Sequence, residues 1–283
     1  MNVLSIQSSV VFGHVGNSAA RLALERLGHE VWPIDTVRLA HHPGYGRWHG
    51  NVAAPAEIAT LLDGLAECGA FARCSAVLSG YLGDAALGTS LLNAVARVKV
   101  GNAKALFACD PVMGDSVKGL YVRPGIPEFF RDRAIARADM LLPNAFELGW
   151  LAGREIDGIA TALAAAHGLL ARGPRLIVVK GLGGRTRGRA LVATLAVEAK
   201  AAWVVECPAV RSQAHGAGDC FSALFLGHYL KRRSARLALE HAVSAIYAVM
   251  TRTARRRSGE LALVEAQDEL RAPKRLFKAA RIG

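Results

Sequence analysis

The sequence contains few of the cysteines that mark secreted or zinc-binding proteins. Its 283 residues include five cysteines, an odd number, with no C-x-x-C pair. This usage argues against a disulfide framework or a zinc site and suits a reducing compartment. We expect all five to be small core residues, including Cys220, which directly follows a glycine-rich motif.

Long hydrophobic runs and a basic leader are also missing. Even the apolar stretch 158–171 is broken by His167 and Gly168, whereas a membrane span needs roughly eighteen or more consecutive apolar residues. The N-terminus has neither a basic leader nor an A-x-A-like cleavage site, so it does not read as a signal peptide. We therefore expect a cytoplasmic protein without a membrane span.

Acidic residues are scarce relative to basic ones, and the net charge is +12. Residues 231–283 hold 13 Lys and Arg against 5 Asp and Glu. Because basic chains often bind nucleic acid, a non-catalytic nucleic-acid-binding protein is one alternative. No aromatic residues interleave with the basic clusters, as a nucleic-acid platform would require. We interpret these clusters as solvated helix ends and do not expect nucleic acid as a partner.

Short apolar, β-branched runs alternate with helical segments, which predicts an α/β fold with a mostly parallel central sheet flanked by helices. Two closely spaced runs, 190–196 and 202–206, predict an antiparallel edge. The length and the even spread of hydrophobic residues predict a single domain over 1–283. We expect Asn17 to cap the first helix. The predicted parallel strands are 3–6, 31–34, 76–80, 105–110, 140–143 and 176–181, and two late helices are predicted over 219–232 and 235–253.

The strongest local signal is His215-Gly216-Ala217-Gly218-Asp219, followed by a helical run. The glycines allow a tight turn whose N–H groups converge, and the helix adds the positive end of its dipole, so the turn could bind phosphate. Asp219 could accept the proton of an attacking hydroxyl. The simpler alternative for Asp219 is a helix N-cap.

Polar residues also follow two of the predicted strands. Asp110 follows the run that ends at 109, within DPVMGD, and Asn144 and Glu147 follow the run 140–143. The carboxyl ends of parallel strands face the ligand crevice of such sheets. Carboxylates there could hold Mg²⁺ or shape an ATP loop, although capping is the alternative for each.

In this order, GAGD before a helix, DPVMGD, PNAFE and VVKG resemble the ribokinase superfamily. The segments IQSSVVFGHVGN, SGYLG and AQDELRAP resemble, more narrowly, bacterial pyridoxal kinases. The similarity covers essentially the whole chain. It implies a ribokinase-like fold, a homodimer, and transfer of the ATP γ-phosphoryl group to the 5′-hydroxymethyl group of pyridoxal, a step of vitamin B6 salvage. A kinase for another hydroxymethyl heterocycle, such as hydroxymethylpyrimidine, is the alternative.

The resemblance also implies roles for individual residues. Asp219 is expected to be the general base, and the amides of Gly216, Ala217 and Gly218 are expected to stabilise the transferring phosphoryl group. The implied Mg²⁺ ligands are Asp110, Asn144 and Glu147. The implied ATP site consists of Asp110, Leu142, Glu147, Lys180, Cys207, Pro208, Ala209 and Val210. The implied substrate site consists of Ser8, Pro43, Gly44, Tyr81 and Asp219.

The chain departs from these kinases in its substrate loop. Pro43-Gly44 stands where they carry a Thr-Gln pair, which removes two side chains and one backbone donor. The stretch between Pro208 and Gly216 is also a few residues shorter, and Ala217 replaces a Val or Thr.

Overall fold

The computed structural model describes residues 1–186 and 188–283. Its strands are β1 (Asn2–Phe12), β2 (Glu30–His41), β3 (Gly50–Val52), β4 (Cys74–Ser79), β5 (Leu106–Cys109), β6 (Gly114–Asp115), β7 (Gly119–Leu120), β8 (Met140–Leu141), β9 (Leu176–Thr186), β10 (Arg189–Glu198), β11 (Ala201–Pro208) and β12 (Ala280–Arg281). Its α-helices are α1 (Asn17–Arg26), α2 (Pro55–Glu67), α3 (Ala86–Gly101), α4 (Ile126–Phe129), α5 (Ala145–Ala152), α6 (Ile159–Leu170), α7 (Ala217–Arg232), α8 (Ala235–Arg256) and α9 (Gln267–Arg271).

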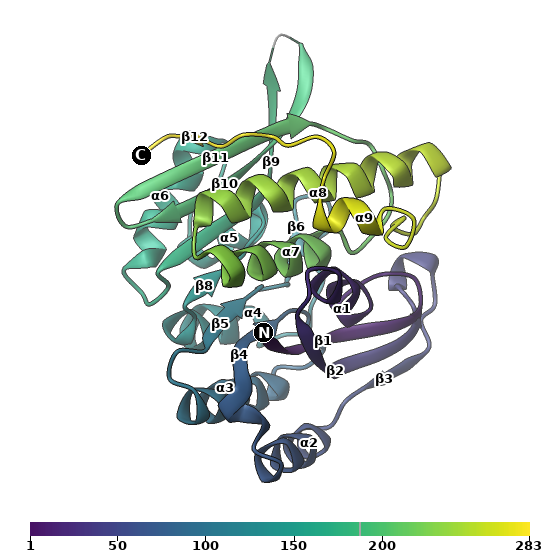
Figure 1. Cartoon of the computed structure of the whole chain (residues 1–283), viewed down its shortest axis with the longest axis vertical. Coiled ribbons are helices and arrows are strands. Elements are labelled where there is room, and N and C mark those ends of the chain that lie inside the picture. The colour runs from purple at the N-terminus through teal and green to yellow at the C-terminus, as the bar shows by residue number, and fades with distance from the viewer. Residues whose placement is uncertain (187) are drawn as a thin grey trace.

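Ten strands form one twisted sheet in the order β12-β11-β10-β9-β8-β5-β4-β1-β2-β3 (Figure 1). The six central strands, from β9 to β2, pair in parallel. At one edge β10, β11 and β12 pair antiparallel, and at the other β3 runs antiparallel to β2. The sequence prediction of a mostly parallel sheet with an antiparallel edge is therefore confirmed.

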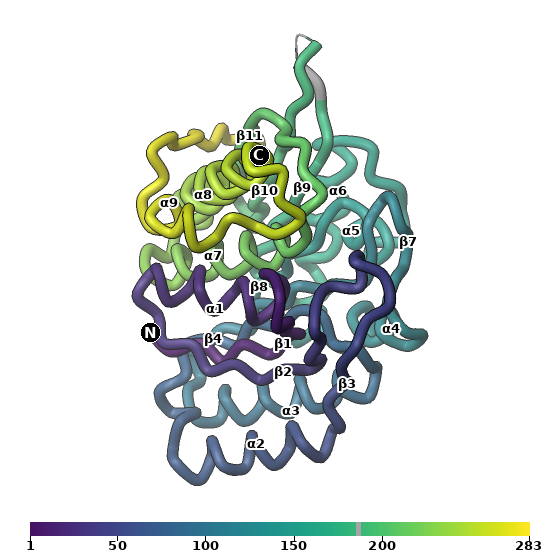
Figure 2. The backbone as a smooth tube through the Cα atoms, turned by 90° about the vertical axis from the view of Figure 1, so that its right-hand side faces the viewer, coloured from purple at the N-terminus to yellow at the C-terminus, as the bar shows by residue number. Residues whose placement is uncertain are grey.

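Helices cover both faces of this sheet (Figure 2). Helices α1, α7 and α8 contribute to one apolar core layer, and helices α2, α3, α5 and α6 contribute to the other. Because both faces are covered, the central strands carry consecutive apolar residues instead of an alternating pattern. In β4, for example, all residues but one are buried. Among the described residues, no helix is long and apolar enough to cross a membrane.

The expected capping role of Asn17 is wrong. Gly16 precedes the first residue of α1, and the buried Asn17 side chain instead donates hydrogen bonds to Ile34 O and to Asp35 Oδ1 at 2.8 Å. Its amide also donates to Gln7 O. Partners on two neighbouring strands, distant in sequence, thus replace the local cap that the sequence pattern suggested.

The expectation that all five cysteines are core residues is also wrong in one case. Cys68 is exposed, whereas Cys74, Cys109, Cys207 and Cys220 are buried. Cys68 lies at the C-terminal end of α2, whose last turn is exposed to solvent. Burial raises the pKa of Cys220 to about 12, which agrees with a packing role rather than a nucleophilic one.

Candidate active site

A cavity of about 870 Å³ lies at the carboxyl ends of the parallel strands. It brings together residues that are far apart in the sequence, such as Ser8 and Asp219. The predicted site residues that line it are Ser8, Pro43, Gly44, Tyr81, Asp110, Asn144, Glu147, Lys180, Cys207, Pro208, Val210, Gly216, Ala217, Gly218 and Asp219.

Two residues of the predicted ATP site do not line this cavity. The Leu142 side chain is fully buried in the core layer on the α7 and α8 side of the sheet. Ala209 donates its backbone N–H to Ala190 O at 3.0 Å, which continues the pairing of β11 with β10. Ala209 nevertheless lies between two cavity-lining residues, Pro208 and Val210.

The glycine-rich turn opens α7 directly into the cavity. Gly216 has φ +87°, and a Cβ there would lie 1.8 Å from His14 O, so only glycine fits this position. Among the described residues, the N–H groups of Ala217, Gly218 and Asp219 have no hydrogen-bond acceptor. Such unpaired first-turn donors are suited to phosphate oxygens.

The Asp219 carboxylate does not cap its own helix, so the capping alternative is excluded. Gly216 is the N-cap residue, and Asp219 Oδ2 accepts a hydrogen bond from Gly16 N at 2.7 Å. Burial raises the pKa of Asp219 to about 6, while the bond from Gly16 opposes this shift. The carboxylate is therefore largely ionised at neutral pH and more basic than an ordinary aspartate.

A second group of contacts joins Asp110, which directly follows β5, to Lys180 in β9 and to helix α7. Lys180 Nζ and Ser222 Oγ both donate to Asp110 Oδ2, each at 2.6 Å. Asp110 is only 2% exposed, so the Lys180 ammonium provides the charge compensation that a buried carboxylate requires. Lys180 lies beside the anion-binding turn, because a Cβ on Gly218 would be 3.8 Å from its Nζ.

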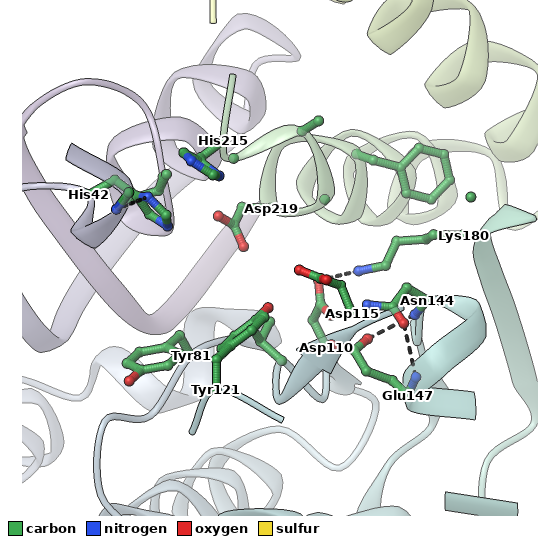
Figure 3. A pocket seen from close by; sticks show the side chains of 18 of the residues that line it. His42, Tyr81, Asp110, Asp115, Tyr121, Asn144, Glu147, Lys180, His215 and Asp219 are labelled. Atoms are coloured by element: carbon green, nitrogen blue, oxygen red, sulfur yellow. Dashed lines mark hydrogen bonds and ion pairs between the residues drawn. The ribbon is translucent and has the colours of Figure 1, made fainter. Parts of the chain in front are cut away.

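Asn144 and Glu147 form a capping box at the start of α5. Asn144 Oδ1 accepts from Glu147 N at 2.9 Å, and Glu147 Oε2 accepts from Asn144 N at 2.8 Å. The other Glu147 oxygen accepts from Met113 N at 3.1 Å. Burial raises the pKa of Glu147, the charge of Lys180 opposes the shift, and the charge of Asp110 adds to it. The box fixes Glu147 beside Asp110 and Lys180 (Figure 3).

The acidic residues fit a divalent cation that arrives with a nucleotide. Asp110 Oδ1 is buried and has no hydrogen-bond partner in the described part of the chain. Asp110, Glu147 and Asp219 bring three carboxyl groups into one cavity, beside the ammonium of Lys180. No group of three or more His, Cys, Asp or Glu within residues 1–186 and 188–283 forms a ready-made cage. Mg²⁺ typically uses one or two carboxylates together with substrate phosphates and water.

Sequence reasoning missed several residues that line the cavity. Lys118 and Tyr121 come from the hairpin of β6 and β7 that covers the acidic cluster, and His42 and His215 lie beside Asp219 (Figure 3). Burial, with the nearby Glu147 charge adding, raises the pKa of the Tyr121 hydroxyl. The DPVMGD motif ends at Asp115, the last residue of β6, but no local pattern distinguishes these residues from ordinary loop residues.

A further contact that sequence reasoning missed supports the side of the cavity that is lined by Pro43 and Gly44. Glu260, in the segment after α8, accepts hydrogen bonds from His14 N at 2.9 Å and from Tyr45 Oη at 2.8 Å. It thus joins the end of β1 to the segment that contains Pro43 and Gly44. Partners separated by 246 and 215 positions leave no signal in a local motif.

The whole chain is similar to known small-molecule kinases. The family model for phosphomethylpyrimidine kinase matches residues 66–263, which places the chain in a class of small-molecule kinases. Pyridoxal kinase PdxY of Rubrobacter xylanophilus is 48% identical over 284 residues, covering 100% of this chain and 98% of the relative. Pyridoxal kinase PdxY of Granulibacter bethesdensis is 44% identical, covering 99% of both chains. The chain therefore belongs to the pyridoxal kinase family.

Solved structures support the same assignment. Pyridoxal kinase from Leishmania donovani in complex with ADP and pyridoxine is 28% identical, with a TM-score of 0.92, and the match covers 100% of this chain and 99% of that one. Pyridoxal kinase from Entamoeba histolytica has the same fold, with a TM-score of 0.90 at 24% identity, over 99% of both chains.

Proposed function

We propose that this protein transfers the γ-phosphoryl group of ATP to the 5′-hydroxymethyl group of pyridoxal, giving pyridoxal 5′-phosphate and ADP. One observation carries the proposal: an ionised, unusually basic Asp219 adjoins free N–H groups and the Asp110–Lys180 pair in a single cavity. A base, an anion-binding turn and a cation beside it are what in-line phosphoryl transfer requires. The relatives named as pyridoxal kinases support the choice of acceptor.

In this reaction Asp219 accepts the proton of the acceptor hydroxyl as its oxygen forms a bond to the γ-phosphorus. The bond from that phosphorus to the β–γ bridging oxygen breaks, and ADP leaves. The N–H groups of Gly216, Ala217 and Gly218 stabilise the charge on the transferring group. Lys180 contacts the nucleotide phosphates, and residues 207–210 form part of the wall around ATP.

Asp110 and Glu147 would hold Mg²⁺ together with the ATP phosphates. Asn144, which the resemblance implied as a third ligand, uses its side chain in hydrogen bonds to Glu147 N and Gly114 O and would instead fix the position of Glu147 through the capping box. When bound, Mg²⁺ neutralises charge that develops on the β- and γ-phosphate oxygens. On the acceptor side, Ser8 would hydrogen-bond the pyridine ring, and Tyr81 and residues 43–44 would close the pocket. We also propose a cytoplasmic homodimer, on the basis of the family resemblance.

The first test compares wild-type protein with Asp219→Asn in an ADP-release assay containing ATP and Mg²⁺. We expect kcat on pyridoxal to fall by about 10³-fold, because the variant cannot accept the hydroxyl proton. Asp268→Asn, on an aspartate whose side chain is 94% exposed, should retain activity. Chelation of Mg²⁺ should abolish turnover in the wild type. Pyridoxal turnover that survives in Asp219→Asn would contradict the catalytic role of that carboxylate.

The alternative acceptor is hydroxymethylpyrimidine, which the relatives named as pyridoxal kinases do not favour. Parallel assays with pyridoxal, pyridoxine, pyridoxamine and hydroxymethylpyrimidine separate the two. A higher kcat/KM on hydroxymethylpyrimidine than on any B6 vitamer would replace our proposal with this alternative.

A further inference from the structure

Two imidazole rings, those of His42 and His215, line the cavity on the side of Pro43 and Gly44. His42 follows β2, and His215 directly precedes the glycine-rich turn. Their rings stack with centroids 3.7 Å apart and planes inclined by 25°. Both lie on the same side of the cavity as Asp219 (Figure 3). His215 therefore stands four residues before the proposed base and within the same pocket.

Gly44 is a glycine for reasons of space and not of backbone conformation. Its φ lies outside the left-handed region, so any residue could adopt its backbone geometry. A Cβ at this position would lie 2.5 Å from His215 Nε2 and 2.9 Å from His42 Nδ1. A side chain at position 44 would therefore have to displace the His215 ring, and residues 44 and 215 compete for one volume.

The His215 ring is free to bind a ligand. Neither of its nitrogens has a hydrogen-bond partner within the described part of the chain, whereas His42 Nδ1 accepts from Gly44 N at 2.9 Å. Burial, with the nearby charge of Lys118 adding, lowers the pKa of His215. Burial and the proximity of His215 lower the pKa of His42 to about 4. At neutral pH His215 is thus an uncharged ring with one donor and one acceptor nitrogen.

We propose that His215 determines the acceptor specificity of this kinase by hydrogen-bonding a polar ring substituent of the heteroaromatic alcohol, and that Gly44 provides the space for it. Pro43 and Gly44 have no polar side chain. His215, from the loop between β11 and α7, therefore provides a polar group on this side of the cavity. This inference rests on the proposed function, because it assumes a hydroxymethyl heterocycle as the phosphoryl acceptor.

The test is a double-mutant cycle of His215→Val and Gly44→Gln, assayed on pyridoxal. We expect His215→Val to raise the KM for pyridoxal about tenfold through loss of one hydrogen bond, with kcat and the KM for ATP within about twofold of wild type. Gly44→Gln should raise the pyridoxal KM at least as much, because it displaces the ring. In the double variant the glutamine can occupy the vacated volume, so its KM should be lower than that of Gly44→Gln alone.

His49→Val, at an exposed residue of the same loop that does not line the cavity, serves as the matched control and should leave the pyridoxal KM unchanged. An unchanged pyridoxal KM in His215→Val, or strictly additive effects in the cycle, would overturn the inference. So would an equal rise in the KM values for pyridoxal and ATP, which indicates a general structural defect. Absence of pyridoxal turnover by the wild-type protein would instead refute the proposed function itself.

Discussion

The two ends of the cavity are built in different ways. At the acidic end Asp110 and Glu147 are each 2% exposed. Asp110 accepts hydrogen bonds from Lys180 in β9 and Ser222 in α7, and Glu147 accepts from Asn144, which precedes α5, and from Met113, which precedes β6. At the acceptor end Tyr45 and Trp48 are 49% and 46% exposed and lie between β2 and β3, in a segment whose only regular element is the short 3₁₀ helix Pro43–Tyr45. Regular elements fix the acidic end, whereas side-chain contacts between distant loops fix the acceptor end.

This difference separates two properties of the enzyme. The acidic end is held together by buried charge pairs. A substitution there lowers the free energy of unfolding strongly, because removing one partner leaves an uncompensated buried charge. The acceptor end depends on individual hydrogen bonds and on a stacked ring pair, and changes there cost less. Substitutions should therefore affect stability and nucleotide binding at one end and acceptor binding at the other.

Among the substitutions that test this difference between the two ends, the largest effect on stability is expected for Lys180→Met. Asp110 would keep only the hydrogen bond from Ser222, so we expect a loss of about 3 kcal/mol in the free energy of unfolding. The KM for ATP should also rise at least about tenfold, because a charge-assisted contact to phosphate is lost. Urea unfolding and steady-state kinetics measure the two effects.

Lys99→Met provides the matched control for that prediction. Lys99 Nζ lies 2.7 Å from Asp139 Oδ2, but the lysine side chain is 36% exposed and lies outside the cavity. Loss of this ion pair should lower the free energy of unfolding by about 1 kcal/mol or less and leave the KM for ATP unchanged. If Lys180→Met and Lys99→Met had equal effects, the distinction between a buried and a partly exposed ion pair would be contradicted.

The next largest effect is expected in the dependence of kcat/KM on pH. Since Asp219 must be ionised to accept a proton and its pKa is about 6, kcat/KM should fall as the pH drops through 6. Below that point the decrease should approach about tenfold per pH unit, and above about pH 7 the profile should be level with respect to this group. Initial rates at saturating ATP between pH 5 and 8 test this. A profile that stays level down to pH 5 would refute the assignment of Asp219 as the base.

The smallest effect is expected at the acceptor end, for Glu260→Gln. The amide nitrogen cannot accept a hydrogen bond, so one of the contacts to His14 and Tyr45 is lost. One such bond is worth about 1 kcal/mol, which corresponds to a roughly fivefold rise in the pyridoxal KM with an unchanged KM for ATP. Glu265→Gln, at an exposed glutamate paired with Arg256, should leave both values unchanged. A rise in the KM for ATP alone would show that Glu260 does not act on the acceptor loop.

The parts of the site that follow strand ends could be predicted from the sequence. Asp110, Asn144, Lys180 and the turn before Asp219 each follow a β-rich run, and parallel strands bring their carboxyl ends to one edge. The capping role of Asn17 was predicted wrongly because its partners lie on β1 and β2. Glu260 and the ring pair could not be predicted, because their contacts join segments more than 150 positions apart.

The sequence by itself determined the α/β architecture, the glycine-rich turn before Asp219 and the kinase family, because hydrophobic periodicity, glycine placement and motif order are local properties of the chain. Only the tertiary structure decided that Asp219 bonds to Gly16 rather than capping its helix, that Lys180 compensates Asp110, and that Gly44 leaves room for an imidazole. The physical reason is that charge compensation and steric fit depend on which distant segments become neighbours, and folding alone brings them together.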